Sequence, residues 1–142
     1  MILYINTIKN DSTKIEIGIF KDGKKIAGRE VRARYAQAEK LLPLIDKLLK
    51  GQKISAGKAG LKKKSQMGLA LIKEIAVVNK GGSFTSLRIG VVTANALGYA
   101  LGIPVSEASE DGQTAGPRKK LGKFSIVQPK YYKEPNITLK KS

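Results

Sequence analysis

The stretch from Gly82 to Gly90 reads G-S-F-T-S-L-R-I-G, and it constrains the fold of this chain more than any other feature. It follows the apolar run Ile75–Val78 and opens a helix-like segment that ends near Gly102. A strand, a glycine turn and a helix start are typical of an α/β protein, where the first helical N–H groups point outward unpaired. Ser83 and Thr85 are both candidate caps for this helix. From the pattern alone, most turns of this kind are simple connections.

The N-terminal third of the chain has the period of a β-sheet. Residues 1–8 are rich in β-branched side chains, and residues 14–20 alternate with their isoleucines on one face. Asp22-Gly23 is a strong hairpin signal, and residues 25–34 return as a third strand. The sequence therefore predicts a three-stranded antiparallel meander.

The pattern then changes to a helical period over residues 35–50, with apolar side chains at spacings of three and four. Pro43 lies inside this pattern, so either the helix starts late, near Leu41, or it is kinked at the proline. Residues 72–78 are apolar on both faces and predict a central strand, and Ile103-Pro104-Val105 starts a fifth. The order β-β-β-α-β-α-β predicts an α/β fold, a mixed sheet with helices packed on it.

Small residues recur every four positions along the predicted helix 83–102, at Ser86, Gly90, Ala94, Gly98 and Gly102. Such a stripe permits close approach of a neighbouring element, because the distance between axes depends on side-chain size at the contact. The neighbour is either the chain's own sheet or a second helix, and the sequence leaves both open.

Composition limits the chemistry. The chain of 142 residues has no cysteine and no histidine, which excludes disulfides, thiolate metal sites and Ser-His triads. No apolar run is long enough to span a bilayer and the N-terminus has no basic leader, so we expect a cytoplasmic protein without membrane contact. We expect no cofactor and no metal, and a stand-alone enzyme is poorly supported.

The formal net charge of +16 favours polyanionic partners, although a lysine-rich proteome would give the same number. Gly57-Lys58 does not make a phosphate loop, because Ala59 stands where Ser or Thr is required. The simplest interpretation of residues 51–71 is a solvated basic loop with a short helix. The candidate tRNA-contacting residues are basic side chains of this loop and of a later polar segment: Lys58, Lys62, Lys63, Lys64, Arg118, Lys119 and Lys120.

Several motifs together resemble the TsaB (YeaZ) family, accessory subunits of bacterial tRNA threonylcarbamoyladenosine synthesis with an actin-like, ribonuclease-H-like lobe. The family's Asp-Thr strand end and F-x-D-G-K hairpin stand here as Asn6-Thr7 and Phe20–Lys24. Its first helix H-S-E-x-L-L-P-x-I is similar to Gln37–Ile45. The family hallmark G-P-G-S-F-T-G-L-R-I-G stands as Lys80–Gly90, the A-x-x-L-x-Y-A-L-G-I-P continuation ends at Pro104, and the closing P-x-Y motif is similar to residues 129–135.

The departures from the family matter as much. A short stretch separates Pro104 from the closing motif, where family members have a second lobe, so the resemblance implies a shortened or divergent member. Asn6 replaces an aspartate that occupies a metal-phosphate position in active relatives, and Gln37-Ala38 and Ser86 replace His-Ser and Gly. We therefore expect a TsaB-like lobe over residues 1–106, a linker over 107–123, and a C-terminal strand and tail over 124–142.

The resemblance implies a non-catalytic protein that binds the transferase TsaD through a four-helix bundle, with two helices from each subunit. Threonylcarbamoyl transfer would then occur on the adenosine beside the anticodon of ANN-reading tRNAs. A TsaE-like ATPase is a further expected partner, and without TsaD the same surface favours a homodimer. The alternative is a basic RNA-binding or scaffold module. The expected interface residues lie on the two helices: Glu39, Leu42, Ile45, Leu49, Ser83, Phe84, Thr85, Leu87, Arg88, Gly90, Val91, Ala94 and Leu97.

Overall fold

The computed structural model describes residues 1–51, 69–111 and 126–130. Within them, five strands form one mixed sheet in the order β3-β2-β1-β4-β5. The strands are β1 (Ile2–Ile8), β2 (Lys14–Lys21), β3 (Lys24–Arg32), β4 (Glu74–Val78) and β5 (Val105–Ala108). Most of the predicted basic loop (residues 52–68), most of the predicted linker and the tail lie outside the described residues.

The predicted meander is confirmed. β1 pairs antiparallel with β2, and β2 pairs antiparallel with β3 across the turn at Asp22-Gly23. On β2 the alternating residues Ile15, Ile17 and Ile19 are buried, as their spacing predicts. β4 and β5 run parallel to β1, so β4 is a central strand and is nearly inaccessible to solvent.

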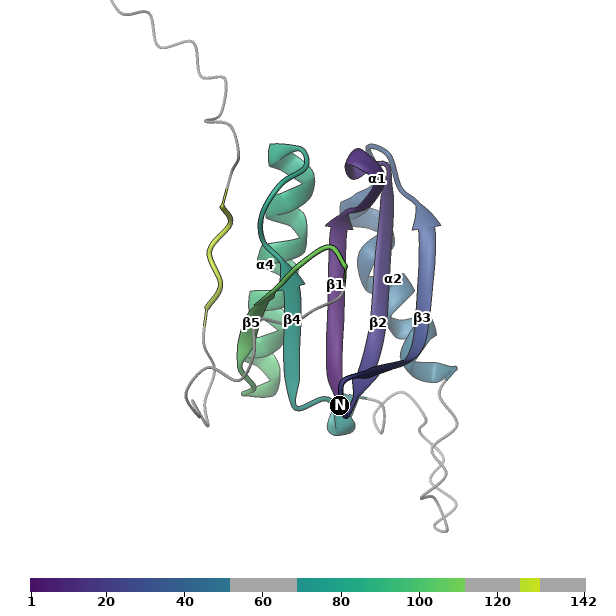
Figure 1. Ribbon diagram of the computed structural model, residues 1–142, viewed down its shortest axis with the longest axis vertical. Helices are drawn as coiled ribbons and strands as arrows, with labels where there is room; N and C mark the ends of the chain where they lie inside the picture. The colour runs from purple at the N-terminus through teal and green to yellow at the C-terminus, as the bar shows by residue number, and fades with distance from the viewer. Residues whose placement is uncertain (52–68, 112–125, 131–142) are drawn as a thin grey trace, which may run out of the picture.

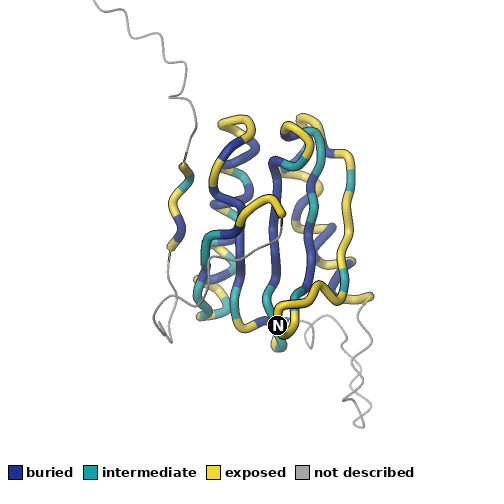
Figure 2. The backbone as a smooth tube through the Cα atoms, viewed as in Figure 1, coloured by how far each residue is buried: buried dark blue, intermediate teal, exposed yellow. Residues whose placement is uncertain are grey.

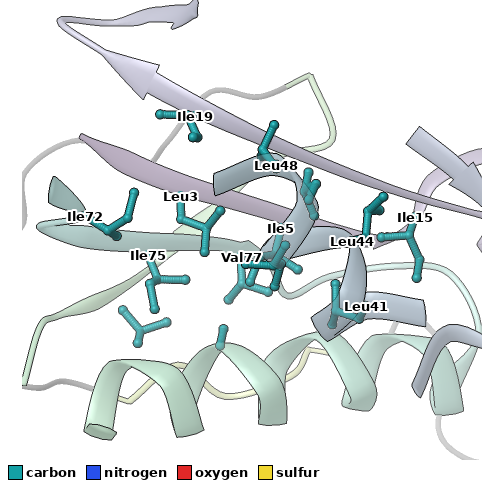
Figure 3. Close-up of a cluster of buried hydrophobic side chains, with 14 of the residues drawn as sticks. Leu3, Ile5, Ile15, Ile19, Leu41, Leu44, Leu48, Ile72, Ile75 and Val77 are labelled. Carbon is teal, nitrogen blue, oxygen red and sulfur yellow. The ribbon is translucent and has the colours of Figure 1, made fainter. Parts of the chain in front are cut away.

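Two long helices, α2 (Gln37–Lys50) and α4 (Phe84–Leu101), cover one face of this sheet (Figure 1). The main hydrophobic core lies between them and the strands, and Figure 3 shows how its leucine and isoleucine side chains interleave. Leu41, Leu44 and Leu48 of α2 meet Leu3 and Ile15 of the sheet in this cluster. The helical spacing of the α2 leucines therefore places its apolar side on the sheet.

The helix α2 is continuous from Gln37, so the predicted late start near Leu41 is wrong. Pro43 lies within it, and proline removes the N–H that would bond to the carbonyl of Glu39. Pro43 and Glu39 are both on the exposed side of the helix, where water can solvate that carbonyl. The exposed position explains how the helix accommodates a proline in its interior.

The opposite face of the sheet is covered differently. The segment after β5 crosses in front of β4 towards β1 (Figure 1), and the Tyr4 hydroxyl donates to the carbonyls of Ser109 and Glu110 at 3.1 and 3.2 Å. β3 at the sheet edge is largely exposed (Figure 2). Among the described residues the two faces therefore differ, because α2 and α4 cover one and the segment after β5 crosses the other.

Candidate functional site

The turn between β4 and α4 packs tightly against the end of β1. Gly82 has a φ of +67°, and a Cβ there would lie 2.5 Å from Cβ of Ile8. Only glycine fits this position, because the site is both left-handed and crowded. The Ser83 N–H donates to Oγ of Ser12 at 2.8 Å, which fixes the turn to the segment after β1.

Ser83 is the N-cap of α4. Its side-chain oxygen accepts a hydrogen bond from the Ser86 N–H at 3.2 Å, as predicted from its position. The parallel prediction for Thr85 is wrong, because Thr85 lies inside the first helical turn and is exposed. A single cap therefore serves the helix.

The small-residue stripe of α4 faces the chain's own sheet. A Cβ on Gly90 would lie 2.5 Å from Oγ1 of Thr7, and that hydroxyl donates to the Ser86 carbonyl at 2.6 Å. Ala94 is fully buried in the same core. The stripe lets α4 approach β1 closely enough for this buried hydrogen bond, which resolves the choice left open by the sequence.

This packing corrects part of the predicted interface. Six of the expected interface residues are buried within this chain, so they contribute to its own core and are not presented on its surface. They belong to the sheet-facing sides of both helices: Ile45, Leu49, Leu87, Gly90, Val91 and Ala94. The apolar period of each helix identified a packed face correctly, but that face packs against β-strands of the same molecule.

The remaining predicted residues are at or near the surface. Leu42 is 52% exposed on α2, and Leu97 is partly buried on α4. Arg88 lies with its guanidinium carbon 5.3 Å from the centre of the Phe84 ring. Glu39, Ser83, Phe84, Thr85 and Arg88 are exposed, and their role in an interface stays a prediction.

Sequence reasoning missed the side of α4 that faces away from the sheet. Val92 is 60% and Tyr99 75% exposed, and Ala96 is exposed between them. We call these three residues, with Leu42 of α2, the outer face. The spacing 92, 96 and 99 places its α4 members on one side of the helix. The same spacing in the sequence could have identified them, but the predicted interface was based on the small-residue stripe instead.

A pocket of about 630 Å³ opens where the chain leaves β1 and β4. Its walls come from α1 (Lys9–Ser12), from the loop and first turn of α2, and from the first turn of α4. The three residues Asn10, Asp11 and Ser12 all have positive φ, so α1 is a left-handed turn and not a regular helix. Tyr35 at the pocket also has a positive φ, of 61°.

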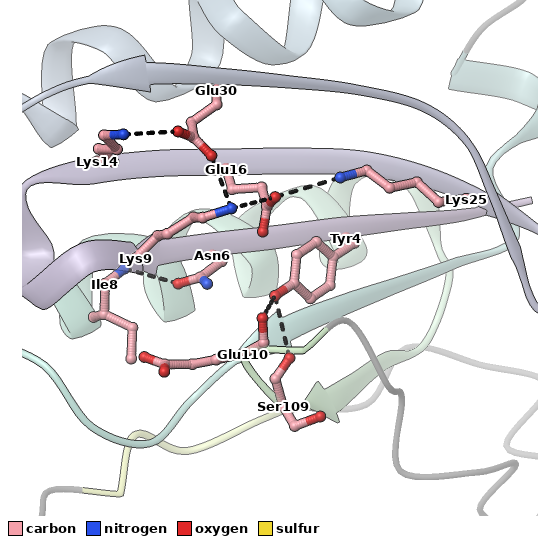
Figure 4. Close-up of polar contacts among 10 residues, drawn as sticks. All are labelled: Tyr4, Asn6, Ile8, Lys9, Lys14, Glu16, Lys25, Glu30, Ser109 and Glu110. Atoms are coloured by element: carbon pink, nitrogen blue, oxygen red, sulfur yellow. Dashed lines mark hydrogen bonds and ion pairs between the residues drawn. The ribbon is translucent and has the colours of Figure 1, made fainter.

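The sheet face opposite α2 and α4 carries a network of charges (Figure 4). The Lys9 ammonium lies 2.7 Å from a carboxylate oxygen of Glu16 and 2.8 Å from one of Glu30, and Lys14 lies 3.1 Å from the other oxygen of Glu30. Hydrogen bonds to the two glutamates raise the pKa of Lys9, and those from Lys9 and Lys14 lower the pKa of Glu30. The positive and negative charges of these pairs therefore offset one another on the surface.

Two polar side chains lie deeper on that face (Figure 4). Burial, and then the nearby charge of Glu16, raise the pKa of Tyr4, so its hydroxyl stays protonated and acts as a donor. Asn6 is fully buried and accepts from the Ile8 N–H at 2.9 Å, while its Nδ2 has no hydrogen-bond partner in the described part of the chain.

The segment 126–130 is held against the flank of α4 (Figure 1). Asn95 binds the backbone of Val127 twice: its Nδ2 donates to the carbonyl at 2.8 Å and its Oδ1 accepts from the N–H at 3.0 Å. Val127 is buried, and Lys130 pairs with Glu107 at 3.0 Å. Lys130 also makes an isolated parallel bridge to Lys80, and the C-terminal strand and tail expected over 124–142 stay a prediction.

Membrane-spanning helices and metal-binding clusters are both absent from the described residues. No helix among them is long and apolar enough to cross a membrane. No group of His, Cys, Asp or Glu side chains in these ranges could hold a metal ion. The candidate tRNA-contacting lysines and arginines all lie outside the described residues.

Comparisons with known proteins agree with this architecture. The structure is similar to YeaZ from Pseudomonas aeruginosa, with a TM-score of 0.57 and 24% identity, covering 76% of this chain and 43% of that one. A second solved structure is an uncharacterized protein with similarity to peptidase YeaZ from the same organism. It matches with a TM-score of 0.57 and 24% identity, covering 76% of this chain and 42% of that one. The chain thus spans less than half the length of these structures, and it has their actin-like, ribonuclease-H-like fold.

No curated protein is significantly similar to the chain in sequence. A family model does match, over residues 32–109, which run from the end of β3 to just after β5 and include the β4–α4 turn. The model describes TsaD, tRNA N6-adenosine threonylcarbamoyltransferase. The matched region is more than half of the chain, and the chain therefore belongs to the TsaD family.

Proposed function

We propose that the chain is a non-catalytic, TsaB-like accessory subunit that binds a TsaD-like transferase through the outer face of α4 and α2. In this role it supports threonylcarbamoyl transfer to the adenosine beside the anticodon of ANN-reading tRNAs. The family membership and the likeness in fold to YeaZ support a place in tRNA modification. We expect the complex in the cytoplasm.

The observation that carries the proposal is the exposed apolar side of α4. Val92 and Tyr99 are each more than half exposed, although the sheet-facing side of the same helix is already packed. Arg88 is the only charged residue in this helix of 18 residues. A helix that is apolar on both sides is normally covered on both, so the outer face fits a protein partner.

Two properties of the chain support an accessory role over a catalytic one. It contains no histidine and no cysteine, so the commonest general base and the strongest nucleophile are missing. At the end of β1, Asn6 replaces an acidic residue and is fully buried. The transferase chemistry then belongs to the partner.

The test is to mix the full chain with the TsaD-like protein of the same organism and to measure mass by size-exclusion light scattering. We expect a one-to-one complex that Val92→Arg abolishes and Lys47→Glu leaves intact. Lys47 is exposed on α2, away from the outer face, and is the matched control. A homodimer that ignores the transferase would overturn the proposal.

A functional measurement complements the mass measurement of the complex. Threonylcarbamoyladenosine in tRNA is quantified by nucleoside mass spectrometry in a strain that carries the wild-type chain or Val92→Arg. We expect the modified nucleoside to fall with the variant and to persist with Lys47→Glu. A TsaE-like ATPase as a third subunit is a further prediction, tested by adding it to the complex.

A second candidate, a basic RNA-binding or homodimeric scaffold, is favoured by the distribution of charge. The three segments outside the described residues hold 12 of the 27 Lys and Arg residues but only one of the 11 Asp and Glu residues. Described residues are closer to balance, with 15 basic and 10 acidic side chains. We expect tRNA binding that weakens steeply with salt. Removal of charge at Lys62, Lys63 and Lys64 should lower the affinity, and an unchanged affinity would exclude that segment.

A further inference from the structure

The sheet ends on one side at β3, whose outer edge pairs with no described strand. β3 is the terminal strand in the order β3-β2-β1-β4-β5, and it has nine residues where β5, at the opposite edge, has four. Seven of the nine residues are exposed (Figure 2). The N–H and C=O groups of such an edge pair readily with another strand, unless the edge is short, covered or charged. The β3 edge is therefore a place where an extended segment of another chain can join the sheet.

The pairing register shows which backbone groups of β3 point outward. The register with β2 is regular from Gly28 to Arg32, since the register shift lies nearer the hairpin. Directly after the strand, the Ala33 N–H donates to the Thr13 carbonyl at 3.0 Å, on the side of β2. Successive residues of a strand alternate in the direction of their backbone groups, so Gly28, Glu30 and Arg32 point away from β2. These three residues form an outward row of donors and acceptors.

This outward row is accessible to a partner. The Lys40 ammonium donates to the Arg32 carbonyl at 2.9 Å, so a donor beyond the strand already reaches one of its acceptors. No hydrogen bond to the outward backbone groups of Gly28 or Glu30 is found in the part of the chain that the structure describes. Both residues are exposed, so water solvates these groups. A strand that displaces this water gains a ladder of backbone hydrogen bonds.

The charge of β3 selects the kind of strand that fits. β3 carries four basic residues and one acidic residue. The acidic residue, Glu30, is already paired with two lysines of the charge network on the sheet face (Figure 4). Lys24, Arg29 and Arg32 have no ion pair with any described residue. The edge therefore presents positive charge that an acidic segment would complement.

Other occupants fit this edge less well. Two copies of β3 side by side would place the basic residues of one strand against those of the other, which is unfavourable. The chain's own segments outside the described residues hold 12 basic residues and one acidic residue, so they are repelled in the same way. A nucleic acid matches the charge, but it cannot form a peptide ladder with the backbone of β3.

We propose that the β3 edge binds an extended acidic segment of a partner protein, which adds a sixth strand to the sheet. The backbone of the segment pairs with the outward groups of Gly28 and Glu30, and its carboxylates lie near the three basic residues that have no ion pair. Ile26, which is 47% exposed on the same strand, contacts an apolar side chain of the segment. This site lies on β3 and does not depend on the complex proposed above.

The test uses the full chain and fluorescence anisotropy with four labelled probes: peptides of four Val-Glu, four Pro-Glu or four Val-Lys repeats, and a five-nucleotide single-stranded RNA. The Pro-Glu peptide keeps the carboxylates but cannot form a strand ladder. We expect the Val-Glu peptide to bind, and the other three probes to bind at least about tenfold more weakly. Equal binding of the two acidic peptides, tighter binding of the RNA, or no binding of the Val-Glu peptide would overturn the proposal.

A backbone variant tests the ladder itself. Gly28→Pro removes one outward N–H, whereas Gly28→Ala adds a Cβ at the same place and keeps the N–H. This Cβ would lie 2.5 Å from Cε of Lys25, whose flexible side chain can move, so both variants should fold. Circular dichroism checks the fold. We expect Gly28→Pro to lose about tenfold in affinity for the Val-Glu peptide and Gly28→Ala to lose less than about threefold. Equal losses would contradict the ladder.

Charge variants test the choice of an acidic partner and do not alter the backbone. We expect Arg29→Gln and Arg32→Gln together to weaken binding of the Val-Glu peptide by about tenfold, with a smaller loss at high salt. Lys130→Gln is the control, because Lys130 pairs with Glu107 of β5 at the opposite edge of the sheet. Equal affinities of the double variant and the control would place the acidic peptide elsewhere and overturn the proposal.

Discussion

The helices α2 and α4 lie side by side on the same face of one sheet, yet their solvent-facing sides differ. α2 carries five charged residues in its 14 positions, and all five are exposed. α4 has Arg88 as its only charge in 18 positions, and its outer side presents Val92, Ala96 and Tyr99. Both helices bury an apolar side against the strands. The comparison teaches that the solvent-facing side of α2 is charged, whereas α4 has a second apolar side that the described residues leave exposed.

The largest effect is expected for a substitution on the side of α4 that faces the sheet. Gly90→Val should destabilise the fold by about 3 kcal/mol or more, because a side chain there collides with Thr7, which lies beneath the helix. Urea denaturation followed by circular dichroism measures the loss. Ala96→Val, on the exposed side of the same helix, is the control and should change stability by less than about 0.5 kcal/mol. Equal effects would show that α4 does not approach β1 so closely.

The next prediction concerns α2. Pro43→Ala should raise stability by about 1–3 kcal/mol, because alanine restores a helical N–H and removes a clash in the helix interior. The same denaturation experiment measures the gain. A loss of stability would mean that Pro43 fixes a bend on which the packing of α2 depends.

A smaller effect is expected at the flank of α4. Asn95→Ala removes both hydrogen bonds to the Val127 backbone and should cost about 1–2 kcal/mol. Hydrogen exchange at residues 126–130 should accelerate, while exchange in β1 and β2 changes little. Unchanged exchange of the segment would show that the buried Val127 side chain alone holds it.

The smallest effect tests the start of α4. Ser83→Ala should cost about 1 kcal/mol through loss of the cap, and Thr85→Ala should cost almost nothing. Thermal unfolding of the two variants gives the difference. If Thr85→Ala is the more harmful substitution, the capping assignment is wrong.

Much of the fold was predictable because each element has a local signal. Alternating isoleucines in β2 and the spaced leucines of α2 specify which side is buried. The β4–turn–α4 unit carries its glycine and its cap in one short string, so its position and its N-cap could be predicted from residues alone. The actin-like resemblance rests on the same string.

The site was less predictable, since its signals are not local. A helix with two apolar sides does not reveal which side meets its own sheet, so Leu87, Val91 and Ala94 were predicted at an interface and lie in the core. The pocket depends on the left-handed backbone of Asp11 and Tyr35, and for tyrosine no sequence pattern predicts it. Asn-Asp at the start of that turn tolerates such a backbone and was the one available hint.

The claim that α4 is the incomplete helix has one direct test. The dissociation constant of the complex with the TsaD-like protein is measured for two arginine substitutions at exposed positions, Val92→Arg on α4 and Asp46→Arg on α2. The account predicts that Val92→Arg weakens binding by about a hundredfold or more, as expected for a charge forced into an apolar contact, while Asp46→Arg changes it less than about threefold. Equal and small effects at both positions would contradict it.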